Sequence, residues 1–286
     1  MLSHIAGGNK TSPGDWPWMA RLIYNNPRET TEKNTFCGGT LISRRHVVTA
    51  GHCITEDVAP VSVVLGDSDV TTDYDCFDVE HGCTTSGKAC ADAEECAPKY
   101  IEVAIKDIIM HDKYKFETCR QCIPFFDVAL LILEENFVFT DFIQPVCLPS
   151  INIERKGPLT VTGWGNIAPG YRNLKSATIL QEINVKEVSL FECKKTWKTK
   201  LEENLIPAHM CASTGVVGST SCRGDSGGPL VRNIDFNKQI WELAGVTSFG
   251  ISTCGNQDYP LVFTRVEGEV NIWLRKLVGT DLTGHL

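Results

Sequence analysis

The amino-acid sequence predicts an all-β protein, either a sandwich or a barrel. Nine short runs of strand-forming residues recur along the 286-residue chain with turn residues between them, whereas helical periodicity is confined to residues 188–197 and 267–277. Hydrophobic residues make up 42% of the chain, which is enough for a substantial core. The predicted strands lie at 18–24, 36–42, 61–65, 100–109, 128–133, 178–185, 228–232, 241–249 and 261–266.

The charge of the chain is concentrated in one segment. The net charge is −8, and residues 67–96 contain nine acidic residues opposed only by Lys88, so that the remainder is neutral. Because the rest of the chain has no net charge, the composition gives no support for nucleic-acid binding, which needs a basic face. No apolar run approaches the ~18 residues of a membrane span. The acids are Asp67, Asp69, Asp73, Asp75, Asp78, Glu80, Asp92, Glu94 and Glu95.

Thirteen cysteines without a repeating metal-ligand pattern predict disulfides and an oxidising, extracellular location. Four of them fall within the acidic segment, so we expect residues 67–99 to form a disulfide-pinned surface insertion. The first ten residues lack the apolar core of a signal peptide, so we expect the export signal to lie outside this chain or to be absent. Because the count is odd, at least one cysteine has no partner within the chain.

Three motifs indicate nucleophilic catalysis. Gly224-Asp225-Ser226-Gly227-Gly228-Pro229 places a serine in a glycine-rich bend. Thr49-Ala50-Gly51-His52-Cys53 places a histidine directly after a β run, and Phe126-Asp127-Val128 places an aspartate at the start of an apolar strand, where a carboxylate is costly unless it is paired. Together they supply a nucleophile, a base and an anion that orients the base.

With these motifs the chain resembles the chymotrypsin-like, trypsin-family serine endopeptidases. The resemblance extends from Ile5 through the C-terminal helix, and its histidine, aspartate and serine follow the family order. It implies a protease domain over 5–280 with two six-stranded antiparallel β-barrels, about 16–133 and about 134–266, and a helix at about 267–278. Residues 1–4 are then a propeptide remnant or an addition to the natural sequence. The remaining motifs are Ile5-Ala6-Gly7-Gly8, Cys37-Gly38-Gly39, Pro145-Val146-Cys147-Leu148-Pro149 and Thr162-Gly163-Trp164-Gly165.

The resemblance implies a role for each catalytic residue. Ser226 attacks the scissile carbonyl, His52 transfers its proton to the leaving amine, and Asp127 orients the imidazole. The backbone N–H groups of Gly224 and Ser226 form the oxyanion hole. Activation pairs a new amine at Ile5 with Asp225.

Three positions depart from the family pattern and change the expected activation and specificity. His4, not Arg or Lys, precedes Ile5, so we expect an activating protease that is not trypsin-like, or four added residues. Thr220 replaces the aspartate at the pocket floor of trypsins, and Leu261 replaces a glycine in the pocket wall. The resemblance therefore implies cleavage after small or medium apolar residues, with large aromatic residues accepted only if Leu261 turns aside. The pocket would comprise Thr220, Ser221, Ser248, Phe249, Gly250 and Leu261.

The resemblance also assigns most of the cysteines. It implies the disulfides Cys37–Cys53, Cys193–Cys211 and Cys222–Cys254, and an interchain bond from Cys147 to a propeptide or light chain. A further disulfide common in the family is absent, because Leu159 and Arg232 stand at the positions of its two cysteines. The remaining six allow 15 connectivities, and none is assigned. These six are Cys76, Cys83, Cys90, Cys96, Cys119 and Cys122.

The acidic insertion has two interpretations. It lies where many family members bind calcium, with Asp67 near its start, but the spacing fits no EF-hand, and a solvated acidic surface is an equal alternative. No other cofactor is expected. The loop from Asp75 to Pro98 resembles that of invertebrate clip-domain proteases, the activators of clotting, melanisation and immune cascades. Asn9 begins a lone glycosylation sequon.

The leading hypothesis is a secreted serine endopeptidase of a proteolytic cascade, acting on a protein substrate and inhibited by a serpin-type protein. One alternative is a catalytically silent binding protein on the protease fold, although such relatives normally lose a triad residue. Another is a broad digestive protease, against which the long cysteine-rich insertion argues, because such a loop suggests a dedicated partner.

Overall fold

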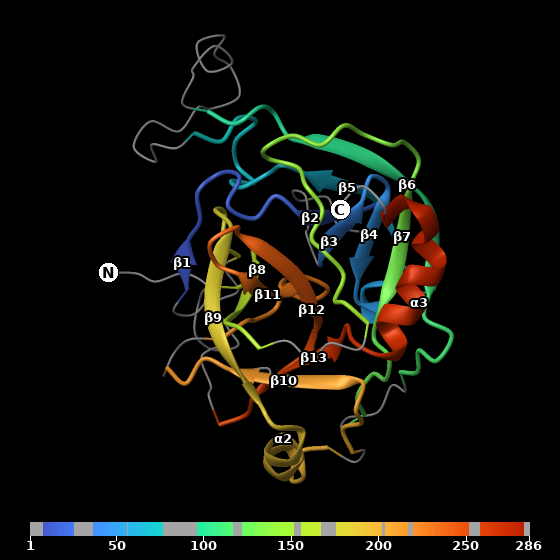
Figure 1. The fold of residues 1–286 in the computed structure, drawn as a ribbon, viewed down its shortest axis with the longest axis vertical. Helices are drawn as coiled ribbons and strands as arrows, with labels where there is room; N and C mark the ends of the chain where they lie inside the picture. Colours follow the sequence, from blue (N-terminus) through green and yellow to red (C-terminus); the bar gives the residue numbers. More distant parts are fainter. Residues whose placement is uncertain are drawn as a thin grey trace.

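The first barrel is formed by six antiparallel strands (Figure 1). The computed structural model describes residues 8–25, 37–55, 57–76, 96–116, 122–151, 156–166, 176–201, 204–216, 220–251 and 258–282. The strands close in the order β2-β3-β4-β7-β6-β5. They are β2 (Met19–Tyr24), β3 (Gly38–Ser43), β4 (His46–Thr49), β5 (Pro60–Leu65), β6 (Ile101–Met110) and β7 (Ala129–Leu133).

The second barrel closes in the order β9-β10-β13-β12-β11-β8, because β8 also pairs with β9. The short strand β1 (Asn9–Lys10) pairs with the first two residues of β9, Gln181 and Glu182. The predicted chymotrypsin-like double barrel is therefore confirmed. The strands are β8 (Leu159–Gly163), β9 (Gln181–Val188), β10 (His209–Ser213), β11 (Pro229–Asp235), β12 (Ile240–Phe249) and β13 (Leu261–Arg265).

Three of these twelve barrel strands were not predicted from the sequence. Strands β4, β8 and β10 have four or five residues, and nearly all of those residues are buried. A strand with both faces buried shows no alternation of polar and apolar residues, so its pattern carries little signal. Strand β6, by contrast, was predicted, since its exposed and partly buried residues alternate.

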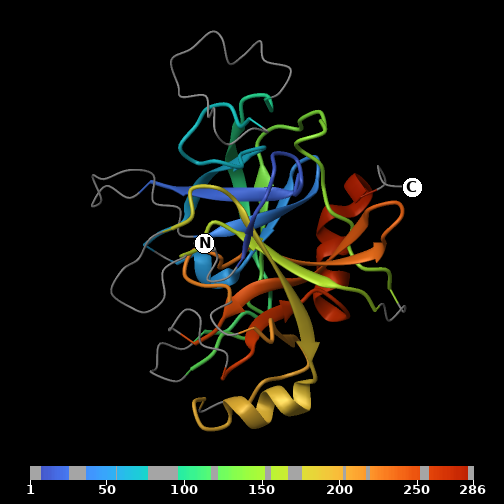
Figure 2. The ribbon, with the colours of Figure 1, turned by 90° about the vertical axis from the view of Figure 1, so that its left-hand side faces the viewer.

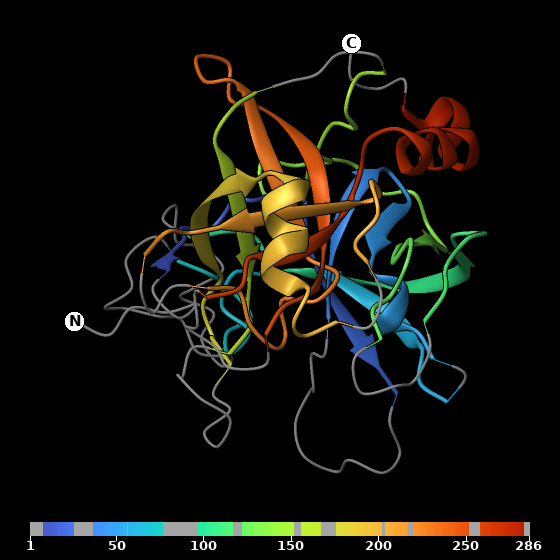
Figure 3. The same cartoon turned by 90° about the horizontal axis from the view of Figure 1, so that it is seen from below.

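The two α-helices of the described residues lie on separate sides of the molecule (Figure 2). Helix α2 (Leu190–Trp197) begins after Ser189, whose Oγ accepts a hydrogen bond from the Glu192 N–H, and it lies across β10 (Figure 3). Helix α3 (Glu269–Val278) follows the second barrel in the chain but packs its apolar face into the core of the first. Two 3-10 helices, η1 (Gly51–Cys53) and η3 (Gly279–Leu282), complete the described elements. None of the described helices meets the length and apolarity of a membrane span.

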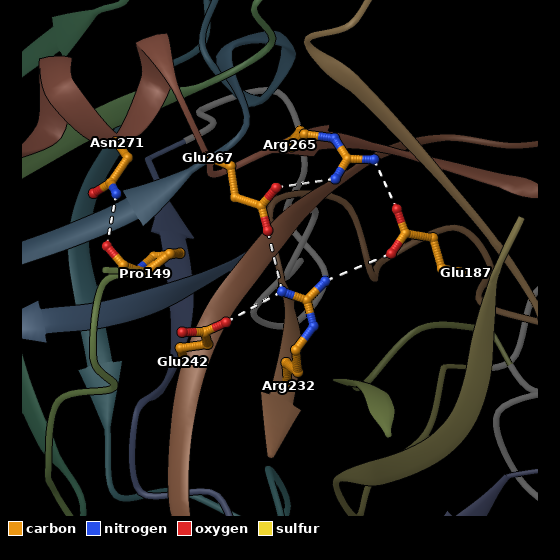
Figure 4. A network of polar contacts seen from close by, with 7 residues as sticks. All are labelled: Pro149, Glu187, Arg232, Glu242, Arg265, Glu267 and Asn271. Carbon is orange, nitrogen blue, oxygen red and sulfur yellow. Dashed lines mark hydrogen bonds and ion pairs between the residues drawn. The ribbon is translucent and has the colours of Figure 1, made fainter. Parts of the chain in front are cut away.

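A buried ion pair occupies the place of the missing family disulfide. Arg232 of β11 pairs in register with Leu159 of β8, and its side chain is only 3% exposed. Its Nη1 lies 3.1 Å from Oε1 of Glu242 and 3.1 Å from Oε1 of Glu267 (Figure 4). Since Glu242 is itself buried, the guanidinium of Arg232 compensates a carboxylate that solvent does not reach.

The same network extends to the surface as a ring of alternating charges. Arg265 binds Glu187 at 2.8 Å and Glu267 at 3.1 Å, and Arg232 completes the ring through Glu187 at 3.6 Å (Figure 4). Glu187, Arg232 and Arg265 come from β9, β11 and the end of β13, and Glu267 lies between β13 and α3. The ring therefore connects one end of the second barrel to the segment that leads into α3.

The acidic insertion is closed at its base by a disulfide between Cys76 and Cys96, one of the pairings that the sequence left open. The two cysteines also form an isolated antiparallel bridge, and the Ala97 N–H donates to the Asp75 carbonyl at 2.6 Å. Cys83, Cys90 and most of the acidic residues lie outside the described residues.

Candidate active site

Asp127 lies just before β7 and is fully buried. Its carboxylate accepts hydrogen bonds from the His52 N–H at 2.8 Å and from the Ser248 hydroxyl at 2.5 Å, and its Oδ2 lies 2.7 Å from Nδ1 of His52. The Thr264 hydroxyl donates to the Asp127 carbonyl at 2.8 Å. His52 follows β4 within η1, so the histidine and the aspartate are held by the first barrel and supported from the second.

This environment sets the charges of the pair. Burial alone would raise the pKa of Asp127, but the charge of His52 and the hydrogen bonds from His52 and Ser248 outweigh it and hold that pKa below its usual value. Burial likewise lowers the pKa of His52, but the negative charge of Asp127 and their hydrogen bond raise it above the ordinary value. Asp127 is thus ionised at neutral pH and favours a protonated imidazole.

Ser226 lies in a bend of the second barrel that packs against the first. Gly224 and Gly227 have φ values of 99° and 76°, which favour glycine. A Cβ on Gly227 would lie 2.3 Å from Oγ1 of Thr49, just before His52 in the chain. The Gly38 N–H donates to the Ser226 carbonyl at 2.8 Å, so the half-buried serine is fixed against the barrel that carries His52.

The expected oxyanion donors are the N–H groups of Gly224 and Ser226. Within the described part of the chain, neither donates a hydrogen bond to another group. Both residues are half-buried.

Asp225, the expected activation residue, is buried beneath this bend. Its carboxylate accepts from the N–H groups of Gly165 at 2.8 Å and Cys222 at 2.7 Å. Cβ atoms on Gly163 or Gly165 would lie 2.2 and 2.4 Å from it, which explains the glycines of the Thr-Gly-Trp-Gly motif. Burial raises the pKa of Asp225 to about 6, and no cation of the described residues pairs with it. Its expected partner, Ile5, lies outside those residues.

The expected specificity residues lie on the walls of the second barrel. Leu261 is buried in the hydrophobic core of the second barrel, and its Cδ2 lies 3.2 Å from the position of a Cβ on Gly250, so its side chain lies beside that glycine. Thr220 is buried, and its hydroxyl donates to the carbonyl of Ser221 at 2.9 Å. Phe249 is half-buried, with its ring 5.6 Å from that of Trp197.

Ser248 and Thr264 show what sequence reasoning missed. Ser248 was expected as a pocket residue, but its hydroxyl binds Asp127. Thr264 was not expected to contribute at all, although it supports the same residue. They are 121 and 137 residues from Asp127 in the chain, and neither motif nor periodicity links them to it.

Disulfides join Cys37 to Cys53 and Cys193 to Cys211, the pairings that the resemblance implies. Cys222 and Cys122 are also disulfide-bonded, while Cys254 and Cys119 lie outside the described residues. The half-buried Cys147 donates its N–H to the Trp241 carbonyl at 3.3 Å.

One group of described residues has the geometry of a metal site but not its chemistry. The ligand atoms of Cys37, His52 and Cys53 lie within 4.8 Å of one another. Because the two sulfurs form a disulfide, they cannot act as thiolate ligands.

The expected calcium site was tested against the donors present. Asp67 is buried and pairs with Arg21, whose Nη2 and Nε lie 2.5 and 3.2 Å from Oδ2. Asp75 is also engaged, since its carboxylate accepts from the Ser68 N–H and the Thr72 hydroxyl. The guanidinium of Arg21 therefore occupies Oδ2 of Asp67, whereas the buried Oδ1 has no hydrogen-bond partner among the described residues. Most of the acidic insertion lies outside those residues, so the calcium site stays a prediction. The sequon residue Asn9 is exposed.

Two barrels with a histidine, a buried aspartate and a serine at their junction define a chymotrypsin-like serine protease. The trypsin family model matches residues 5–274, and the chain belongs to that family of serine endopeptidases.

Curated relatives agree with this assignment. The chain is 33% identical over 283 residues to Melanization protease 1 of Drosophila melanogaster, covering 96% of this chain and 65% of that protein. It is 32% identical to CLIP domain-containing serine protease B9 of Anopheles gambiae, covering 95% of this chain and 62% of the relative. The chain thus spans just under two thirds of the length of these relatives. The predicted likeness to clip-domain proteases is confirmed.

A solved structure shows the same fold. Neuropsin, a serine protease expressed in the limbic system of mouse brain, superposes with a TM-score of 0.68 at 24% identity, covering 95% of this chain and 98% of that one.

Proposed function

We propose that this chain is the catalytic part of a secreted serine endopeptidase that hydrolyses peptide bonds in a protein substrate. The observation that carries the proposal is the buried Asp127 bound to both the backbone and the Nδ1 of His52, on the barrel against which the Ser226 bend packs. A histidine so oriented can take a proton from a serine hydroxyl.

In the proposed reaction, the Oγ of Ser226 forms a bond to the substrate carbonyl carbon while its proton moves to Nε2 of His52. The proton then passes to the leaving amine as the peptide bond breaks, and water releases the acyl group by the same steps in reverse. Asp127 stabilises the imidazolium in each tetrahedral stage. The N–H groups of Gly224 and Ser226 stabilise the oxyanion, a contribution of about 3–4 kcal/mol per donor in related enzymes.

Activation is proposed to begin with cleavage before Ile5. A new amine would bind Asp225, whose buried carboxylate has no cationic partner among the described residues. Such pairing removes the cost of an isolated buried anion. It would also order the adjacent bend that carries Gly224 and Ser226.

Specificity is proposed for small or medium apolar residues before the cleaved bond. The uncharged Thr220 offers nothing to Arg or Lys, and Leu261 narrows the space beside Gly250. Faster cleavage after Arg than after Val, Ala or Leu in a peptide panel would contradict this proposal.

The biological setting is proposed by similarity. A relative is named for melanization and another for its clip domain, which favours a cascade protease over a digestive one. The odd number of cysteines and the family resemblance support a disulfide between Cys147 and a propeptide. A serpin-type inhibitor is proposed as a further partner. Disulfide mapping of the natural protein tests the link through Cys147.

The decisive experiment compares the chain cleaved before Ile5 with its Ser226→Ala variant. A fluorophosphonate should label the cleaved wild type stoichiometrically and abolish its peptidase activity, while the variant takes no label and is inactive. Thr220→Ala serves as a control that should still be labelled. Full turnover by Ser226→Ala would overturn the triad, and an unlabelled, inactive wild type would support a catalytically silent binding protein.

A further inference from the structure

The segment from Pro124 to Asp127 is held from the second barrel at three points. Two are the hydroxyls of Ser248 and Thr264, which bind the carboxylate and the carbonyl of Asp127. The third is His209, whose Nε2 lies 3.0 Å from the carbonyl oxygen of Pro124. His209 and Thr264 are direct cross-strand partners on the adjacent strands β10 and β13 (Figure 1).

The hydrogen bonds of His209 determine its tautomer. The Ile206 N–H donates to Nδ1 at 2.9 Å, so Nδ1 must act as the acceptor and the proton must lie on Nε2. Nε2 therefore donates to Pro124. The residue is only 1% exposed, and burial lowers its pKa, which keeps the ring in the neutral form that these two bonds require.

The His209 ring also packs against two aromatic rings, those of Phe125 and Phe249. It lies 5.6 Å from the ring of Phe125 and 6.1 Å from that of Phe249 in edge or tilted geometry. Phe249 is one of the expected pocket residues, and Phe125 follows Pro124 directly. His209 thus contacts both the segment that delivers Asp127 and the strand that carries the pocket.

We propose that His209 is a positioning residue of the protease, which holds the Pro124–Asp127 segment and Phe249 in register across the junction of the two barrels. This inference rests on the proposed function. His209 acts through Asp127 and Phe249, and it needs no contact with substrate. A displaced Asp127 would support the His52 imidazolium less well, and displacement of a catalytic group by about 1 Å can cost about 100-fold in rate.

The test compares His209→Leu with His209→Gln in the chain cleaved before Ile5, with active sites counted by fluorophosphonate. Leucine removes the donor, whereas the Nε2 of glutamine can still reach Pro124. We expect His209→Leu to lower kcat by about 10- to 100-fold and to move the acidic limb of the pH profile to lower pH. His209→Gln should retain most of kcat and an unshifted limb.

The matched control is His46→Leu, the same change at another buried histidine, which binds Ser43 in the first barrel. It should lower the melting temperature and leave kcat per active site unchanged. If His209→Leu does not fold, His209→Asn replaces it, because asparagine can accept from Ile206 but is too short to reach Pro124.

If His209→Leu or His209→Asn keeps the wild-type kcat and the wild-type acidic limb, the role of His209 is purely structural and the inference is overturned. The inference is also overturned if His209→Gln loses as much kcat as His209→Leu. In both cases the wild type would still be active, so the proposed function would stand. An inactive, unlabelled wild type would overturn the proposed function and this inference together.

Discussion

The carboxylate of Asp127 holds His52 by two hydrogen bonds, one to the backbone N–H and one to Nδ1. The side chain of Asp127 is fully buried, while 24% of the His52 side chain is exposed. The carboxylate of Asp127 is thus shielded from solvent, whereas the imidazole of His52 that it binds is accessible to a substrate. The relationship explains why the pKa of Asp127 is lowered and that of His52 is raised.

The first prediction concerns pH dependence. His52 must be neutral to accept a proton, so kcat/KM should rise with pH through a midpoint above the ordinary imidazole value of about 6.5. Asp127→Asn should lower kcat by about 10⁴-fold and move that midpoint down, because the negative charge is lost. A pH profile of the two proteins checks this, and an unchanged midpoint would contradict the assigned role of Asp127.

The second prediction concerns the pocket. Leu261→Gly removes the side chain that lies beside Gly250, so cleavage after Phe should gain at least about 10-fold relative to cleavage after Val. A panel of peptides that differ only before the cleaved bond measures this ratio. Val161→Ala, a core truncation in the same barrel, should lower stability without altering the ratio. An unaltered ratio in Leu261→Gly would place the specificity elsewhere.

The third prediction concerns Asp225. Its pKa of about 6 in the folded chain exceeds the ordinary 3.8, so ionisation opposes folding. This cost is absent below pH 3.8, grows as pH rises toward 6, and amounts to about 3 kcal/mol at neutral pH. Cleavage before Ile5 should remove it by supplying a cation. The cleaved chain should therefore be more stable at pH 7, with a smaller advantage at pH 4.

Thermal unfolding of the cleaved and uncleaved chains at both pH values measures this advantage. If cleavage stabilises the chain equally at pH 4 and pH 7, Asp225 is not the residue that pairs with the new amine on activation.

The fourth prediction concerns the buried ion pair between Arg232 and Glu242. Arg232→Met removes the guanidinium that faces the buried Glu242 and should lower the free energy of unfolding by about 3–5 kcal/mol. Arg44→Met changes an exposed arginine that lies over the ring of Phe139 and should cost less than about 1 kcal/mol. Denaturant unfolding compares the two variants. Equal losses in the free energy of unfolding would show that the buried pair stabilises the fold no more than an exposed arginine does.

The fifth prediction concerns calcium. Because Arg21 already compensates Asp67, calcium should not raise the melting temperature of the wild type, and a chelator should not lower it. Arg21→Gln should destabilise the protein strongly, since a buried carboxylate loses its cation. A calcium-dependent rise in the wild-type melting temperature would show a cation site that these donors do not reveal.

Local patterns predicted much of the fold. The alternating strand β6 and the two helices were located within about two or three residues, because alternation and a helical apolar face are readable in a short window. Strands β4, β8 and β10 were missed, because with both faces buried they show no alternation and each has only four or five residues. The longer strand β3 is equally buried and was predicted from its continuous run of strand-forming residues.

The sequence by itself determined the family, because the resemblance depends on short motifs whose order is informative. That resemblance in turn implied the roles of His52, Asp127 and Ser226 and the disulfide between Cys37 and Cys53, which the structure contains. Only the tertiary structure decided what surrounds them. Asp127 is bound by Ser248 and Thr264, and Asp67 is bound by Arg21. These partners lie 121, 137 and 46 residues apart in the chain. Closure of each barrel and the packing of one against the other bring them together, and no local pattern records such contacts.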